Sequence, residues 1–149
     1  MKTVFADTAF WVALARSRDQ WRVAARNALR QLGPVTIVTT DEVLTEFLTS
    51  LSKAGPEARL RAVRSVRELQ NDPGVRVMPQ SRKSFCKALD RYEGRSDKSY
   101  SLQDCVSMNV MEAQSITEIL TSDRHFEQEG FTVLMKQADA RSPQGNRGG

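Results

Sequence analysis

The chain contains very little cysteine and histidine, and this scarcity narrows the chemistry open to it. It has two cysteines, Cys86 and Cys105, and a single histidine, His125. The cysteines lack the close pairing of a zinc site, and one histidine cannot supply both a zinc ligand set and a Ser-His-Asp triad. We therefore expect neither kind of hydrolase, and we interpret both cysteines as thiols buried in the core.

Long apolar segments and nucleotide-binding glycine motifs are also missing. No apolar run approaches the roughly 18 residues that a membrane span requires. The N-terminus has no basic start followed by an apolar stretch and a small-residue cleavage site. Neither Gly-x-Gly-x-x-Gly nor a P-loop is present. We expect a cytoplasmic protein with no membrane segment.

Neither sign of charge dominates the composition. The chain has 22 Lys and Arg residues against 18 Asp and Glu residues, which gives a formal net charge of +4. If four acids gather in one pocket, 14 acidic residues remain against 22 basic ones, and such a surface attracts a phosphate backbone. A charge of this size also serves solubility, so it permits nucleic acid binding without requiring it.

Apolar periodicity and turn signals predict strands that alternate with helices. The expected strands are 2–6, 35–39, 75–78, 116–120 and 131–134, and the expected helices are 9–15, 21–32, 41–53, 57–70, 81–93, 101–112 and a single turn at 125–129. This order predicts an α/β fold with one domain over 1–137, in which a mostly parallel central sheet of four to five strands has helices on both faces. We expect the remaining segment, 138–149, to be a disordered tail.

The helix expected at 81–93 places Phe85, Ala88, Leu89 and Tyr92 on one face, a pattern typical of a helix packed on a core. The polar segment 94–99 follows this helix. We expect it to be a mobile loop, because such loops are common beside active sites.

Two acids stand at the ends of predicted strands. Asp7 follows the first strand and Asp123 comes just after the fourth. The carboxyl ends of parallel strands meet at one edge of a sheet, where functional groups collect. An Asp at such a position also serves as a cap, because its carboxylate accepts hydrogen bonds from free backbone N–H groups of the next helix. Both interpretations are open for each residue.

Asp104 is a third candidate. The segment from Ser101 to Asp104 has the Ser-x-x-acid form of a capping box at a helix start. Met108 and Met111 continue the Asp104 face of this helix, whose other sides are also mostly apolar. Because a buried carboxylate needs a cation or hydrogen-bond donors, we expect Asp104 to point into a cleft.

Glu46 lies on the polar flank of the helix at 41–53, so its position alone predicts an ordinary solvated residue.

Phosphodiester cleavage is a reaction that would require the four acids to lie in one site. It needs an activated water and charge neutralisation on the attacking and leaving oxygens, which two divalent cations about 3.5–4 Å apart provide. Mg²⁺ and Mn²⁺ select carboxylate oxygens rather than thiols or imidazoles.

Four blocks of the sequence resemble, in order and spacing, the acidic blocks of the PIN-domain family, and most closely its stand-alone VapC-like toxins. They are 5–8 (Phe-Ala-Asp-Thr), 41–46 (Asp-Glu-Val-Leu-Thr-Glu), 100–105 (Tyr-Ser-Leu-Gln-Asp-Cys) and 120–126 (Leu-Thr-Ser-Asp-Arg-His-Phe). The resemblance spans about 4–134, and the last two blocks together are the most specific.

This resemblance implies a Mg²⁺- or Mn²⁺-dependent endoribonuclease that acts on RNA and often forms a homodimer. In the toxins of the family it also implies a protein antitoxin as inhibitor. The resemblance maps the catalytic, metal-binding acids onto four positions, and polar supporting side chains onto two: Asp7, Glu46, Asp104 and Asp123, with Thr8 and Thr121 in support.

The sequence departs from the family pattern at two places. Ala9 stands where many relatives carry a second small polar side chain, and Asp97 is an additional acid, either a solvated loop residue or an outer ligand. Ala9 also disfavours a phosphatase, which would carry a second Asp there. The alternatives are an RNA-processing PIN nuclease without an antitoxin and a non-catalytic RNA-binding PIN protein, although the latter is expected to lose site acids.

Arginines recur along two of the predicted helices. They are Arg22, Arg26 and Arg30 in the helix at 21–32, and Arg59, Arg61, Arg64 and Arg67 in the helix at 57–70. Such stripes are either ordinary solvated surface or guides for a phosphate backbone.

Overall fold

The structure is a computed structural model that describes residues 1–137. Its strands are β1 (Lys2–Ala6), β2 (Val35–Thr40), β3 (Val75–Met78), β4 (Glu118–Leu120) and β5 (Thr132–Val133). They form one parallel sheet in the order β3-β2-β1-β4-β5. The predicted α/β fold is confirmed, while the tail expected at 138–149 lies outside the described residues.

β1 lies at the centre of this sheet. Phe5 is in register with Val38 of β2 on one side and with Ile119 of β4 on the other. Phe5 and Val38 are fully buried, as expected where helices cover both faces of a parallel sheet. Because neighbouring strands run in the same direction, the end of β1 at Ala6 and the end of β4 at Leu120 open onto the same edge.

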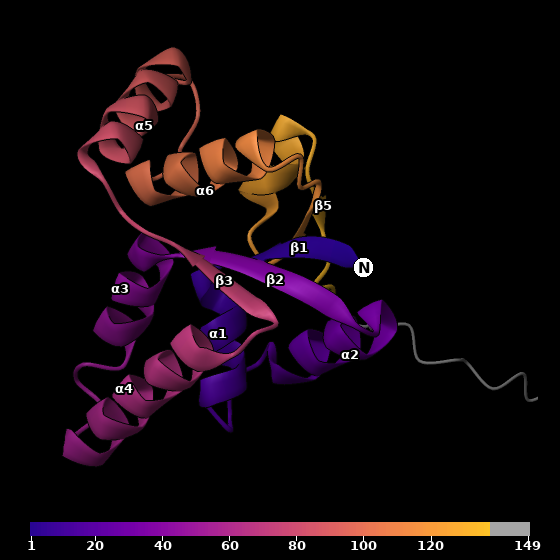
Figure 1. Cartoon of the computed structure of the whole chain (residues 1–149), viewed down its shortest axis with the longest axis vertical. Helices are drawn as coiled ribbons and strands as arrows, with labels where there is room; N and C mark the ends of the chain where they lie inside the picture. Colours follow the sequence, from indigo (N-terminus) through magenta and orange to yellow (C-terminus); the bar gives the residue numbers. More distant parts are fainter. Residues whose placement is uncertain (138–149) are drawn as a thin grey trace, which may run out of the picture.

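The helices are α1 (Thr8–Ala15), α2 (Arg22–Leu32), α3 (Asp41–Ser50), α4 (Pro56–Asn71), α5 (Arg82–Gly94) and α6 (Leu102–Ala113), with a 3₁₀ turn, η1 (Arg124–Glu129). In Figure 1, α1, α2 and α4 lie on one side of the sheet, and α5 and α6 lie on the other. α5 is the outermost element of its side and packs on α6.

Three side-chain caps fix the helix starts. The side chains of Thr40, Ser81 and Ser101 each accept a hydrogen bond from the backbone N–H three residues further on. Each of these bonds satisfies one of the free donors at a helix N-terminus. α3, α5 and α6 therefore begin where the sequence predicted.

One prediction about packing is wrong, because Cys86 is exposed, whereas Cys105 is fully buried as expected. The apolar face predicted for α5 is only partly covered. Ala88 is fully buried, but Phe85 is 41% exposed, Leu89 is 43% exposed and Tyr92 is 53% exposed. α5 packs on α6 through its neighbouring face, so these three apolar side chains remain open to solvent. We call them the α5 stripe.

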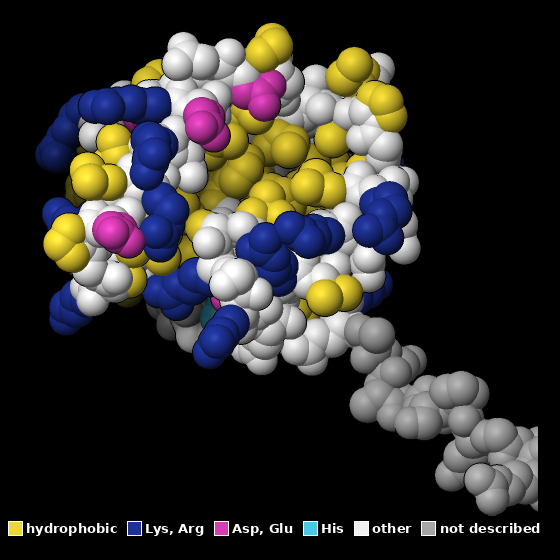
Figure 2. Space-filling model, turned by 90° about the horizontal axis from the view of Figure 1, so that it is seen from below, with side chains coloured by type: hydrophobic (Ala, Val, Ile, Leu, Met, Phe, Trp, Pro, Cys, Tyr) yellow, Lys and Arg dark blue, Asp and Glu magenta, His cyan; other side chains and the backbone are white. Residues whose placement is uncertain are grey.

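Figure 2 shows the opposite side of the molecule, where α1, α2 and α4 lie. Apolar side chains gather in a hollow on this side, with Lys and Arg side chains to its left and below it and Asp and Glu side chains along its upper edge. Between the end of α1 and α4 there is a cavity of about 790 Å³, lined by Leu14, Ala62, Arg18, Asp19 and Arg61 among others. We call it the α1–α4 hollow. None of the described helices is long and apolar enough to cross a membrane.

Candidate active site

Acids from four different elements meet beyond the carboxyl edge of the sheet. Asp7 follows β1, Glu46 is on α3, Asp104 is in the first turn of α6, and Asp123 precedes η1. Burial is the main reason that the pKa values of Asp7, Glu46 and Asp104 are raised, and neighbouring carboxylates add to it. The charges of Asp104 and Glu46 raise the pKa of Asp7, and the charge of Asp123 raises the pKa of Glu46 and of Asp104. We call this cluster the acid site.

Asp7 is the most enclosed of the four acids. It is 6% exposed, and its side chain makes no N-cap hydrogen bond to α1. Its Oδ2 accepts a hydrogen bond from the Thr121 hydroxyl at 3.0 Å, and its Oδ1 accepts one from the Gln103 amide at 3.3 Å. Burial raises its pKa to about 7. Helix capping therefore does not account for Asp7.

Asp104 both caps α6 and faces the acid site. The Ser101 hydroxyl accepts from the Asp104 N–H at 3.0 Å, and Asp104 Oδ2 accepts from the Ser101 N–H at 3.0 Å. The predicted capping box is thus present. Asp104 is also buried, and burial followed by the charge of Asp123 raises its pKa. One carboxylate therefore serves the helix and the site together.

Glu46 lies on the exposed flank of α3, as its helical position predicted. Its pKa is nevertheless raised, first by partial desolvation and then by Asp104, while the Thr8 hydroxyl acts in the opposite direction. The Glu46 carboxylate therefore faces the other acids from the solvent side of the site.

Thr8 and Thr121, the two expected supporting residues, are both buried. The Thr121 hydroxyl donates to Asp7 and accepts from the Asp123 N–H at 3.1 Å, so it joins the two acids that follow β1 and β4. The Thr8 hydroxyl donates to the Val43 carbonyl at 3.5 Å, which links α1 to α3 beside the site.

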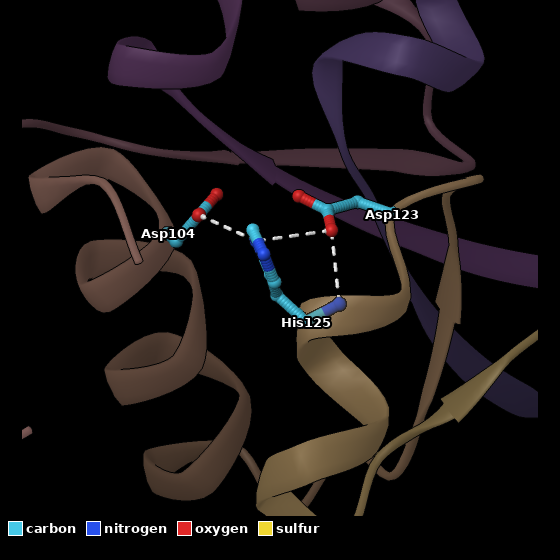
Figure 3. Close-up of side chains that lie close together, drawn as sticks. All are labelled: Asp104, Asp123 and His125. Atoms are coloured by element: carbon cyan, nitrogen blue, oxygen red, sulfur yellow. Dashed lines mark hydrogen bonds and ion pairs between the residues drawn. The ribbon is translucent and has the colours of Figure 1, made fainter. Parts of the chain in front are cut away.

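The structure adds His125, which the sequence analysis left out of the site. In Figure 3 its ring lies between Asp104 and Asp123. His125 Nδ1 is 3.2 Å from Asp123 Oδ1 and 4.0 Å from Asp104 Oδ2. Asp123 Oδ1 also accepts the His125 backbone N–H at 2.9 Å, so the predicted capping role of Asp123 is present as well. The available signal was the position of this histidine two residues after a site acid.

The structure also gives a role to Gln103 and decides between the two interpretations of Asp97. Gln103 was not predicted as a site residue, but its amide donates a hydrogen bond to the Asp7 carboxylate. Nothing in the sequence indicated this contact beyond the position of Gln103 next to Asp104 in the first turn of the same helix. Asp97 is exposed and pairs with Lys98 at 3.6 Å, which favours the solvated loop residue over an outer ligand.

The acid site has no basic side chain to balance it. Within residues 1–137, no Lys or Arg forms an ion pair with any of the four acids, and His125 is their only partner of that kind. Crowded carboxylates without a counter-charge repel each other, and their oxygens are the ligands that Mg²⁺ and Mn²⁺ prefer. Both the donor set and the buried Nδ1 of His125, which lies beside two of these carboxylates without a hydrogen bond in the described residues, fit a divalent cation.

Comparisons with known proteins agree with this geometry. The family model for the PIN domain matches residues 4–131. Among solved structures, the crystal structure of Mycobacterium tuberculosis VapC20, described as a sarcin-ricin loop cleaving toxin, is similar over 89% of this chain and 99% of its own. The two share 25% sequence identity and superpose with a TM-score of 0.78. No curated protein matches the chain.

Proposed function

This chain belongs to the PIN-domain family, and we propose that it is a Mg²⁺- or Mn²⁺-dependent endoribonuclease that acts in the cytoplasm as a VapC-like toxin. The observation that carries the nuclease proposal is the acid site. Its carboxylates come from distant parts of the chain, and Asp7 is hydrogen-bonded to Thr121, 114 residues further along. No Lys or Arg of the described residues forms an ion pair with these carboxylates. The similarity to the VapC20 toxin over nearly all of both chains supports the toxin role.

Each residue of the acid site has a separate role in the proposed phosphodiester cleavage. When bound, divalent cations supply an activated water and neutralise charge on the phosphate oxygens. Asp7, Asp104 and Asp123 are the acids that hold them from the sheet side, and Glu46 holds them from the solvent side. Thr121 and Gln103 keep the Asp7 carboxylate in one orientation, so the ligand set is fixed before RNA arrives.

The first test of this proposal is metal-dependent cleavage. We expect the purified chain, freed of any partner protein, to cut sarcin-ricin loop RNA with Mn²⁺ or Mg²⁺ and to stop in EDTA. Asp7→Asn keeps the shape of the side chain but removes its charge, and we expect it to lower the rate by about 10²-fold or more. Asp97→Asn is the matched control, because Asp97 is exposed and lies outside the acid site. Cleavage that continues undiminished in EDTA would contradict the metal mechanism.

A growth assay with induced expression distinguishes the toxin from the two alternative functions. Induced expression of a toxin arrests growth, and expression of Asp7→Asn does not. An RNA-processing nuclease would cleave RNA in vitro without arresting growth, and a non-catalytic RNA-binding protein would bind RNA equally well with and without the Asp7 charge. The VapC20 similarity favours the first outcome.

We also propose a homodimer in which the α5 stripes of two copies face each other. Arg91 pairs with Glu129 at 3.1 Å and donates to Asn109 at 2.7 Å, which fixes the side of α5 that packs inward. Tyr92 follows Arg91 by one residue, so the α5 stripe lies about 100° round the helix from that side. Three apolar side chains on one open face favour contact with a partner.

Charge makes an antiparallel arrangement of these two helices favourable. Arg82 lies at the N-terminal end of the α5 stripe and Glu93 at its C-terminal end, and neither has an ion-pair partner among the described residues. A two-fold axis near Leu89 brings Arg82 beside the partner's Glu93 and Phe85 beside the partner's Tyr92. Such a contact uses the same patch on both copies, as two-fold interfaces do.

The α1–α4 hollow is the surface that we propose for an antitoxin. Its lining combines apolar side chains, among them Leu14 and Ala62, with three arginines against one acid: Arg16, Arg18 and Arg61, with Asp19. An acidic amphipathic segment of a protein satisfies both features, because its apolar side covers the apolar lining while its carboxylates meet the arginines.

A further inference from the structure

We infer that His125 is a nitrogen ligand of the acid site, with Nδ1 binding the divalent cation that Asp104 and Asp123 hold. This inference rests on the proposed function, because it assumes that the carboxylates take up a cation. It extends that function, since the four predicted ligands provide oxygen atoms only.

The first observation is that Nδ1 makes no hydrogen bond. This atom is buried, and although it lies 3.2 Å from Asp123 Oδ1, the two do not have hydrogen-bond geometry in the described part of the chain. A buried polar atom left without a partner is unfavourable, so it indicates that a partner is missing. The polar atoms that face it are the carboxylate oxygens of Asp104 and Asp123.

The distances between these atoms suit a shared cation. In an octahedral site with bonds of about 2.1 Å, adjacent ligand atoms lie about 3.0 Å apart and opposite ones about 4.2 Å apart. Nδ1 is 3.2 Å from Asp123 Oδ1 and 4.0 Å from Asp104 Oδ2. Donor atoms of Asp104, Asp123 and His125 all lie within 4.8 Å of one another. One cation can therefore contact all three residues after only a small adjustment.

Neighbouring groups hold the imidazole ring in the orientation that a ligand needs. Nε2 lies 3.1 Å from the Ser99 hydroxyl, which accepts a hydrogen bond from Nε2–H when Nδ1 carries no proton. Metal-binding histidines commonly donate their other ring N–H to such a partner. The backbone of His125 is bound to the Asp123 carboxylate, and its ring packs against Tyr100 with centroids 5.8 Å apart.

A nitrogen ligand changes which cation the acid site prefers. Mg²⁺ favours oxygen ligands, whereas imidazole suits first-row transition metals. We therefore expect His125 to raise the affinity for Mn²⁺ more than the affinity for Mg²⁺. The preference is a property of binding, so it is measurable without RNA and without turnover.

The experiment is pulsed electron paramagnetic resonance of Mn²⁺ bound to the full chain. Because the chain has one histidine, any imidazole coupling to Mn²⁺ comes from His125. We expect a ¹⁴N imidazole modulation that changes when only histidine is labelled with ¹⁵N. His125→Gln should abolish it and lower the Mn²⁺ affinity by about tenfold or more, with a smaller change for Mg²⁺. Asp97→Asn is the matched control, because Asp97 is exposed and outside the acid site, and it should keep the nitrogen coupling.

The possible outcomes distinguish a failure of this inference from a failure of the proposed function. If wild type binds Mn²⁺ without a histidine coupling, and His125→Gln keeps the same ratio of Mn²⁺ to Mg²⁺ affinity, the nitrogen ligand is wrong and the carboxylate site stands. If wild type binds neither cation, both the inference and the proposed function are overturned. The labelled wild-type spectrum decides the question even if His125→Gln does not fold.

Discussion

Asp7 carries a proton in the folded chain over a pH range in which the unfolded chain has lost it. Burial raises its pKa from 3.8 to about 7. The stability that the bound proton contributes is fully present below pH 3.8 and is lost as the pH rises through 7. A difference of about three pKa units corresponds to about 4 kcal/mol of unfolding free energy. Under the proposed function, a divalent cation would replace this proton at neutral pH and restore the lost stability.

We therefore expect wild type in EDTA to become less stable as the pH rises from 4 to 7. Asp7→Asn should remove most of that slope and should be more stable than wild type at pH 7 without metal. The measurement is urea unfolding at several pH values, with Asp97→Asn as the control that keeps the slope. An unchanged slope in Asp7→Asn would assign the pH dependence to another group.

Individual residues could be predicted where chemistry and chain position agree. Asp7 and Asp123 stand at strand ends and Asp104 stands in a capping box, so their positions relative to the sheet followed from the sequence. The contacts of Gln103 and His125 could not be predicted, because they depend on how α6 and η1 pack against the end of β1. Cys86 shows the same limit, since a thiol alone does not indicate which side of a helix is covered.

Among the elements, α5 leads to a specific prediction about dimerisation, because its α5 stripe is exposed. We expect the chain to sediment as a dimer at micromolar concentration, because the α5 stripe has no cover within residues 1–137. Leu89→Asp places a charge at the centre of the stripe and should raise the dissociation constant by at least about tenfold. Val23→Asp is the matched control, since Val23 is an exposed apolar residue of α2 at 71% exposure.

Charge reversal tests the direction of the paired helices. Arg82→Glu and Glu93→Arg should each weaken the dimer, because each puts like charges together, and the double variant should restore it. Sedimentation velocity of the four proteins gives the answer. A dimer that survives Leu89→Asp, or a chain that is monomeric at all concentrations, would show that α5 is not the interface.

The elements were predictable where a local signal marks their ends. Caps at Thr40, Ser81 and Ser101 set three helix starts. β4 is shorter than predicted and begins at Glu118, because strand length depends on the partner strands, and β4 pairs with only short stretches of β1 and β5. Periodicity predicted the apolar face of α5, but it could not predict that the α5 stripe is exposed, because periodicity identifies an apolar face and not what covers it.

At the scale of the whole molecule, the proposed function assigns RNA cleavage to the acid site and antitoxin binding to the α1–α4 hollow, and this separation can be tested. Arg18→Glu together with Arg61→Glu reverses the charge of the α1–α4 hollow and leaves the acid site untouched. We expect this variant to cleave RNA at the wild-type rate but to escape neutralisation when the antitoxin is expressed with it. Lys83→Glu on α5 is the control for a general effect of charge. A cleavage rate that falls with the hollow charges would instead assign these arginines to RNA binding.

The order of the strands also decides when, during synthesis, the acid site can assemble. β1 is the first of the five strands to be made, and one of its two neighbours in the sheet is β4, which is the fourth. Asp7 is therefore made long before Thr121 and Asp123, the residues to which its site is joined. A nascent chain that stops before β4 lacks the complete acid site. The proposed nuclease activity cannot begin on the ribosome until the chain has grown past Asp123.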